Sequence, residues 1–177
     1  EQLVLKRLLA GEPTPIEILL APAAPLWALL VVQSGLAIVG AVALGTSIAH
    51  PWALALAVAG GSAVWTALAV WGATWTRTVE SAQLTTMPLI IVSLLLSGFS
   101  LPLSMFPPLV ERIAHWLPMT PVIDLVNLAF HGTGVDGSVL VGRDLLTGTI
   151  DILIPLLLWT VATLNLGLRG FRWDARS

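Results

Sequence analysis

The sequence predicts an all-α membrane protein that crosses the bilayer several times, and two observations carry this prediction. Of the 177 residues, 56% are hydrophobic and only 10% are charged, whereas about a quarter of the residues in a soluble domain are charged. Residues 18–76 and 81–110 contain no Asp, Glu, Lys or Arg. Because a transmembrane helix needs about 20 apolar residues, these runs and the uncharged stretch 152–168 have room for four spans.

Residues 1–20 mix charged and apolar side chains and predict a short amphipathic segment rather than a span. Leu5, Leu8 and Leu9 recur at helical spacing. Pro13 and Pro15 interrupt the pattern. The first half of the segment is therefore expected to be a helix that lies along the membrane surface.

Four transmembrane helices are expected after this segment, and tryptophans mark the ends of one of them. Trp52 stands at the start of the second span and Trp71 and Trp75 at its end, as expected for indole rings at the two membrane–water interfaces. Pro88 falls inside the third span, where neighbouring groups in a membrane bundle can hydrogen-bond the carbonyl that it frees. The predicted spans are residues 26–48, 52–75, 82–103 and 150–168.

The stretch between the third and fourth spans is too broken for a span and too apolar for a solvated loop. Asp124, Asn127 and His131 form a narrow polar stripe on an otherwise apolar piece of it. We expect a re-entrant helical hairpin over residues 105–131, which is permissible only where protein or water surrounds its backbone. The stripe either contacts a substrate at the outer face or is satisfied by water or a partner helix. The prolines that break the stretch are Pro107, Pro108, Pro118 and Pro121.

Basic residues predict the orientation of the spans, because they are enriched in cytoplasmic loops. A cytoplasmic N-terminal segment leaves only Arg112 and Arg143 outside. The opposite orientation inverts this ratio, so both ends of the chain are predicted to be cytoplasmic and the hairpin external. The basic residues then inside are Lys6, Arg7, Arg77, Arg169, Arg172 and Arg176.

The composition excludes several kinds of active site. Without cysteine there is no disulfide and no thiolate metal site, and the three histidines form no HExxH motif, so no metal site is expected. The single lysine, Lys6, is not part of a GxxxxGK[ST] loop for nucleotide. A net charge of −2 without a basic block offers no surface for nucleic acid. The chain opens with Glu1 and shows no cleavable leader, so it is expected to be a piece of a longer protein.

Two other classes of function stay open as alternatives. An intramembrane enzyme needs a nucleophile, and Ser97 precedes Gly98. However, Leu95 stands two residues before Ser97, where a rhomboid-like GxSG motif needs its first glycine, and Phe99 follows Gly98. An ion-coupled secondary transporter usually carries an ionisable residue at the membrane midplane. The predicted spans contain none at that depth.

Polar residues inside the predicted spans are the candidates for a transport route. We select Gln33, Thr66, Ser97 and Asn165. The alternative is structural, because Ser and Thr commonly hydrogen-bond carbonyls of their own helix and amides often find partners on neighbouring helices.

Several motifs follow one another along the chain in a characteristic order. They are Leu5-Lys6-Arg7-Leu8-Leu9 before Pro13 and Pro15; Thr76-Arg77-Thr78-Val79-Glu80-Ser81-Ala82-Gln83; and, most specific, Leu96-Ser97-Gly98-Phe99-Ser100-Leu101-Pro102-Leu103, Met105-Phe106-Pro107-Pro108-Leu109 and Leu117-Pro118-Met119-Thr120-Pro121 with Asp124. In this order they resemble the permease subunit of ABC-2 type exporters. The drug-resistance branch, which includes daunorubicin exporters, is the most similar.

The sequence departs from the family pattern at a few places. The family usually has six spans, so the resemblance implies that the first two are missing and that residues 1–177 are the C-terminal part of a single transmembrane domain. Leu3-Val4 replaces a frequent Gly-Thr, and Thr120-Pro121 replaces the Asn-Pro of the hairpin.

The resemblance implies a transport subunit without catalytic residues, a cofactor or a nucleotide site of its own. ATP and its Mg would bind to a separate ATPase subunit, on which residues 1–20 would dock as a cytoplasmic coupling helix. Lys6, Arg7 and Glu12 are the expected docking residues. The alternative is that these charges only extend to water.

The resemblance also implies an assembly and a cargo. Two permease copies, identical or paralogous, would lie in the lipid of the inner, or cytoplasmic, membrane with two ATPase subunits. The expected cargo is amphipathic or lipid-like, such as a drug, an antibiotic, a lipid or a glycan, with a role in multidrug resistance.

Overall fold

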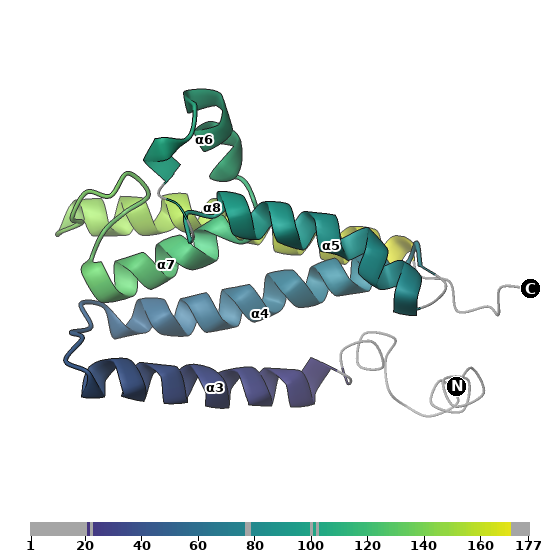
Figure 1. Cartoon of the computed structure of the whole chain (residues 1–177), viewed down its shortest axis with the longest axis horizontal. Coiled ribbons are helices and arrows are strands. Elements are labelled where there is room, and N and C mark those ends of the chain that lie inside the picture. The colour runs from purple at the N-terminus through teal and green to yellow at the C-terminus, as the bar shows by residue number, and fades with distance from the viewer. Residues whose placement is uncertain (1–20, 22, 77–78, 100, 102, 171–177) are drawn as a thin grey trace, which may run out of the picture.

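The computed structural model describes residues 21, 23–76, 79–99, 101 and 103–170, and helices account for most of them (Figure 1). An isolated antiparallel bridge between Thr133 and Val139 is the β-pairing found in this part of the chain. The prediction of an all-α protein is therefore confirmed for the described residues. The helices are α3 (Ala23–Ala43), α4 (Pro51–Ala73), α5 (Val79–Leu96), the 3-10 helix η1 (Leu103–Met105), α6 (Pro108–Ala114), α7 (Thr120–His131) and α8 (Arg143–Gly170).

Three of these helices, α3, α4 and α8, are long and apolar enough to cross a membrane. The described part of α5 offers a shorter apolar stretch, Gln83–Leu96. The third predicted span, 82–103, is thus represented by a helix that stops at Leu96, because Gly98 has φ +80° and turns the chain. The number of four spans therefore remains a prediction. The structure has several apolar helices that are long enough to cross a membrane.

The helices run back and forth along one axis (Figure 1). Ala43 and the start of α4 lie at one end of the bundle, and α4 returns to the other end, where α3 begins. Backbone hydrogen bonds from the N–H groups of Ala49 and His50 to the carbonyl of Ala129, at 2.8 and 2.9 Å, join the turn between α3 and α4 to α7. The α7 helix therefore lies at the end of the bundle away from the start of α3.

Helix α4 is the centre of the bundle because both α8 and α7 pack on it. Val64, Leu125 and Ile152 come from these three helices and are almost fully buried in one apolar cluster. By contrast, α3 has no buried residue, and its leucines and valines are exposed. Apolar side chains on the outside are what a lipid solvent requires.

The last helix begins earlier than the predicted span 150–168, at Arg143. Gly142, with φ +57°, precedes it, and the intervening threonines bond carbonyls of their own helix: Thr149 Oγ1 donates to the carbonyl of Leu145 at 2.6 Å. Pro155 lies inside the helix. The polar start of α8 is helical because its hydroxyl groups are satisfied locally.

The region expected as a hairpin consists of short helices joined by proline turns. Helix α6 projects sideways from the bundle (Figure 1), and Pro108 and Pro121 occupy the first turns of α6 and α7, where a missing N–H costs nothing. Thr120 Oγ1 donates to the carbonyl of Ala114 at 2.6 Å and ties the two helices together. Helix α7 ends at Gly132, whose φ of +69° gives the left-handed cap that suits glycine.

The expected coupling helix of residues 1–20 and the basic residues Arg77, Arg172 and Arg176 lie outside the described residues.

Candidate functional site

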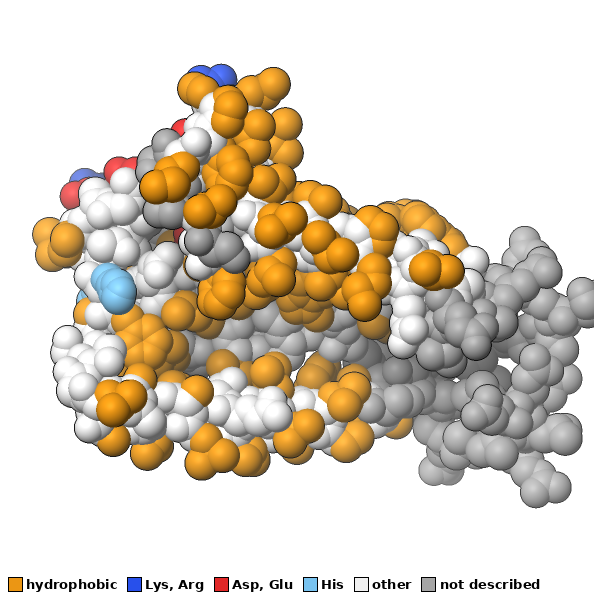
Figure 2. Space-filling view, viewed as in Figure 1, with side chains coloured by type: hydrophobic (Ala, Val, Ile, Leu, Met, Phe, Trp, Pro, Cys, Tyr) orange, Lys and Arg blue, Asp and Glu red, His pale blue; other side chains and the backbone are white. Residues whose placement is uncertain are grey.

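A groove of about 1090 Å³ lies between α3 and α4, with α7 at one end of it. In the space-filling view it is the hollow between α3 and the rest of the molecule (Figure 2). Ligand sites commonly have about 300–1,000 Å³ and mostly apolar walls with a few polar groups. Its lining residues come from α3 (Ala23, Leu26, Trp27, Leu29, Leu30, Gln33, Ser34, Ala37, Ile38, Ala41), α4 (Leu54, Ala57, Val58, Gly61, Ser62, Trp65, Thr66, Ala69, Val70, Ala73) and α7 (Met119 at its start, Val122, Val126, Phe130).

The groove exists because α3 makes few contacts with α4. Near the start of α3, Trp27 Nε1 donates to Thr66 Oγ1 of α4 at 3.0 Å. At the other end, the turn after Ala43 is held to α7 by the bonds to the Ala129 carbonyl. Alanine and serine side chains face the space between these two attachments, and they are too short to fill it.

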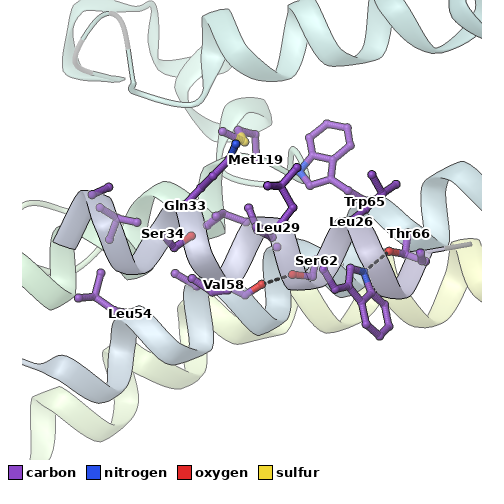
Figure 3. A pocket seen from close by; sticks show the side chains of 18 of the residues that line it. Leu26, Leu29, Gln33, Ser34, Leu54, Val58, Ser62, Trp65, Thr66 and Met119 are labelled. Carbon is purple, nitrogen blue, oxygen red and sulfur yellow. Dashed lines mark hydrogen bonds between the residues drawn. The ribbon is translucent and has the colours of Figure 1, made fainter. Parts of the chain in front are cut away.

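Four polar side chains line this apolar groove, and no ionisable residue does among those that the structure describes. Ser62 Oγ donates to the carbonyl of Val58 on its own helix, and Thr66 accepts from Trp27. Gln33 and Ser34 lie near the middle of α3 and make no hydrogen bond with any described residue. Figure 3 shows the Gln33 side chain extending from α3 into the groove, so its amide is available to a ligand.

The structure brings two of the four predicted route residues together and leaves two elsewhere. Gln33 and Thr66 both line the groove. Ser97 lies at the end of α5, 1% exposed, and donates to the carbonyl of Leu94 at 2.9 Å. Asn165 Nδ2 donates to the carbonyl of Val161 at 2.8 Å on the exposed side of α8. The sequence reasoning did not select Trp65, whose indole stands in the groove beside Leu26 (Figure 3).

The hairpin holds a buried carboxyl group. Asp124 on α7 is 8% exposed and has no hydrogen-bond or ion-pair partner among the described residues. Desolvation raises the pKa of Asp124 to about 7, because burial disfavours the charged form. Asn127 and His131 are exposed, so the predicted polar stripe begins with a buried side chain, Asp124, and continues with exposed ones.

The hairpin is anchored to the bundle through tryptophan. Trp159 Nε1 on α8 donates to the backbone carbonyl of Trp116, which follows α6. Leu109 and Ile113 on α6 are 70% and 54% exposed. Pro107 precedes α6 and Pro118 is buried in the turn before α7, so these prolines shape the turns around α6, and neither lines the groove between α3 and α4.

No group of three or more His, Asp or Glu residues that could hold a metal ion occurs among residues 21, 23–76, 79–99, 101 and 103–170. The expected docking residues Lys6, Arg7 and Glu12 fall outside these ranges.

Several long apolar helices with an uncharged groove between them define a multi-pass membrane protein. A family model described as ABC-2 family transporter protein matches residues 2–168. The chain belongs to this family, and it is a permease component of an ABC exporter. No curated protein and no solved structure matched the chain.

Membership has two consequences. The family comprises membrane components of transport that have no ATPase site of their own, and it implies an ATP-binding partner subunit. Neither an intramembrane enzyme nor an ion-coupled transporter is favoured.

Proposed function

We propose that this chain moves an amphipathic or lipid-like substrate out of the cytoplasm and that ATP hydrolysis on a separate subunit drives the movement. The observation that carries the proposal is the groove between α3 and α4, whose walls are apolar and whose polar groups are uncharged. A charged solute would lose its hydration there without an ion pair in return. An amphiphile can place its apolar part on these walls and a hydrogen-bonding group near Gln33 and Ser34.

The proposal includes the way in which the energy reaches the bundle. Residues 1–20 would dock on the ATPase subunit through Lys6, Arg7 and Glu12 and pass its motion to α3. This part rests on the resemblance of the segment to the family's coupling helix and on the place of α3, which begins at the end of the bundle away from α7.

Two copies of the permease are part of the proposal, identical or paralogous. The groove opens along the side of the bundle, and α3 is exposed over its whole length. A single chain therefore offers a surface for a substrate and no enclosed path, which a second copy would complete. In the proposed orientation both chain ends are cytoplasmic and α6 and α7 lie on the outer side.

The first experiment tests the partnership. The full-length native protein is purified in mild detergent, and the co-purifying proteins are identified. An ATPase subunit is expected, and the double reversal Lys6→Glu/Arg7→Glu should remove it. Arg169→Glu is the matched control, because Arg169 is an exposed cation at the end of α8 outside the docking segment. Absence of any ATPase under conditions that preserve other transporter complexes would contradict the proposed function.

A second experiment tests the groove in proteoliposomes that contain the complete transporter. Val58→Trp places an indole in the groove and should lower the export of fluorescent amphiphiles severalfold. Leu158→Trp is the control, because Leu158 is 54% exposed on α8 and does not line the groove. Equal export by both variants would exclude the groove as a route, and export of ionic solutes as readily as amphiphiles would refute the substrate class.

A further inference from the structure

A second, smaller cavity of about 230 Å³ lies between α4 and α5, near the end of the bundle where α4 stops. Its walls contain Trp65 and Trp71 of α4 and Trp75, which follows the end of α4. Trp71 and Trp75 have no part in the proposed function. The residues that form it include Trp65, Trp71, Trp75, Thr85, Thr86 and Leu89. The indole rings give this cavity a different binding chemistry from that of the groove between α3 and α4.

The rings are set at an angle to one another. Trp71 and Trp75 have ring centroids 4.4 Å apart and planes inclined by 70°, so they pack edge to face, and both line the cavity. Trp71 is partly buried against the apolar core, whereas Trp75 is 61% exposed. One wall is therefore held firmly and the other stands at the mouth of the cavity.

The described walls of the cavity carry no acidic or basic side chain, and Thr85 Oγ1 already donates to the carbonyl of Ser81 at 2.7 Å. Indole rings have negative faces, and quaternary ammonium groups bind to such faces in aromatic cages. A cation in this cavity would therefore be held by the tryptophans rather than by an ion pair.

The described walls carry no carboxylate that could accept hydrogen bonds from a cation, and this favours a cation without N–H groups. A primary ammonium is a compact, strongly hydrated charge and would lose its water here without replacement. A trimethylammonium group has no N–H to satisfy, and it presents methyl groups to the rings. The cavity is large enough for such a group and too small for a whole amphiphile.

The two cavities adjoin, since Trp65 and Ala69 line both the small cavity and the groove between α3 and α4. An alkyl chain attached to a group in the small cavity can therefore continue along an apolar surface. The geometry points to a binding site in this cavity for the quaternary ammonium group of a membrane-dissolved amphiphile, which would lie against Trp71 and Trp75. Trp65 lines the part of the cavity that continues into the groove. This inference concerns binding and does not require that the bound molecule is the exported one.

The test is a titration of the full-length protein in phosphatidylglycerol nanodiscs, followed by tryptophan fluorescence. Dodecyltrimethylammonium should produce a saturable change. The neutral isostere, with a tert-butyl group in place of trimethylammonium, should bind about tenfold more weakly, the difference expected from a desolvated cation–π contact. Equal affinity for the two compounds would overturn the proposal, because shape and hydrophobicity alone would then explain binding.

Variants locate the site. Trp71→Leu should weaken binding of the cation about tenfold, and Trp71→Phe should retain most of it because a ring face remains. Trp116→Leu is the matched control, since Trp116 is an exposed tryptophan on the hairpin, far from these walls in the sequence and absent from them. An affinity unchanged by Trp71→Leu, or a Phe variant as weak as the Leu variant, would refute the site even if the Leu variant were poorly folded.

The ammonium group could come from a choline lipid or from a free amphiphile, and the nanodisc lipid separates these sources. In phosphatidylcholine nanodiscs, a lower apparent affinity for dodecyltrimethylammonium identifies the lipid headgroup as a competing occupant. An unchanged affinity identifies the free amphiphile. Since the assay uses neither ATP nor transport, its outcome is independent of whether an ATPase subunit co-purifies.

Discussion

Gly167 of α8 is the position at which a single methyl group should do most harm to the bundle. A Cβ atom built there would lie 2.8 Å from Val70 Cγ1, 3.0 Å from the backbone nitrogen of Trp71 and 3.2 Å from the backbone carbon of Val70. Two of these atoms belong to the main chain of α4 and cannot rotate away. Gly167→Ala must therefore push α8 away from α4, which disturbs the most extensive helix pair of the bundle.

The size of the effect follows from two opposing terms. Overpacking of a well-packed site costs about 1–3 kcal/mol, and alanine in place of glycine favours a helix by about 1 kcal/mol. The net loss in the free energy of unfolding for Gly167→Ala is therefore expected to be about 1 kcal/mol and at most about 2 kcal/mol. Gly35→Ala on α3 meets nothing within 4 Å and should be neutral or stabilising by up to about 1 kcal/mol.

A third variant separates a clash with backbone from a clash with a side chain. The Cβ of Gly60→Ala would meet only the end of the Leu156 side chain, which can adopt another rotamer, so its cost should be smaller than that of Gly167→Ala. The assay is reversible unfolding by SDS in mixed micelles, followed by circular dichroism. If Gly167→Ala is as stable as Gly35→Ala, the close backbone approach of α4 and α8 is wrong.

Three further outcomes are expected. Trp27→Phe should weaken the attachment of α3 to α4 by about 0.6 kcal/mol, the average for hydrogen bonds between membrane helices. A double-mutant cycle with Thr66→Val should give a coupling energy of the same size. Additive effects of the two substitutions would show that the 3.0 Å hydrogen bond does not form. Trp159→Phe should speed amide hydrogen exchange in α6 because it removes the donor to the Trp116 carbonyl, and unchanged exchange would contradict this anchoring. Since burial raises the pKa of Asp124 to about 7, its carboxyl favours the folded state below about pH 4, and this contribution should be lost as the pH rises to about 7. Asp124→Asn should flatten the decline in stability across that window, and an equally steep decline in the variant would show that another group is responsible.

The lengths of the apolar runs were enough to predict a helical membrane protein. Uncharged stretches long enough to span a bilayer can only be satisfied as helices there, and glycine and proline mark where helices stop or start, as Gly98 does after α5 and Pro108 at the start of α6. Four spans and a re-entrant hairpin remain predictions. The ends of the helices were less predictable, because residues 143–149 of α8 are polar yet satisfy their hydroxyl groups within the helix.

The rotation of each helix about its axis was decided only by the tertiary structure. A transmembrane helix is apolar on the side that faces lipid and on the side that faces protein, so its sequence carries no amphipathic pattern to distinguish the two. This is why Gln33 and Thr66 were found to share a groove while Asn165, selected on the same grounds, points along its own helix. Trp65 and Trp75 could each be assigned from sequence to a membrane helix or its interface, and only the packing of α5 on α4 makes them walls of one cavity.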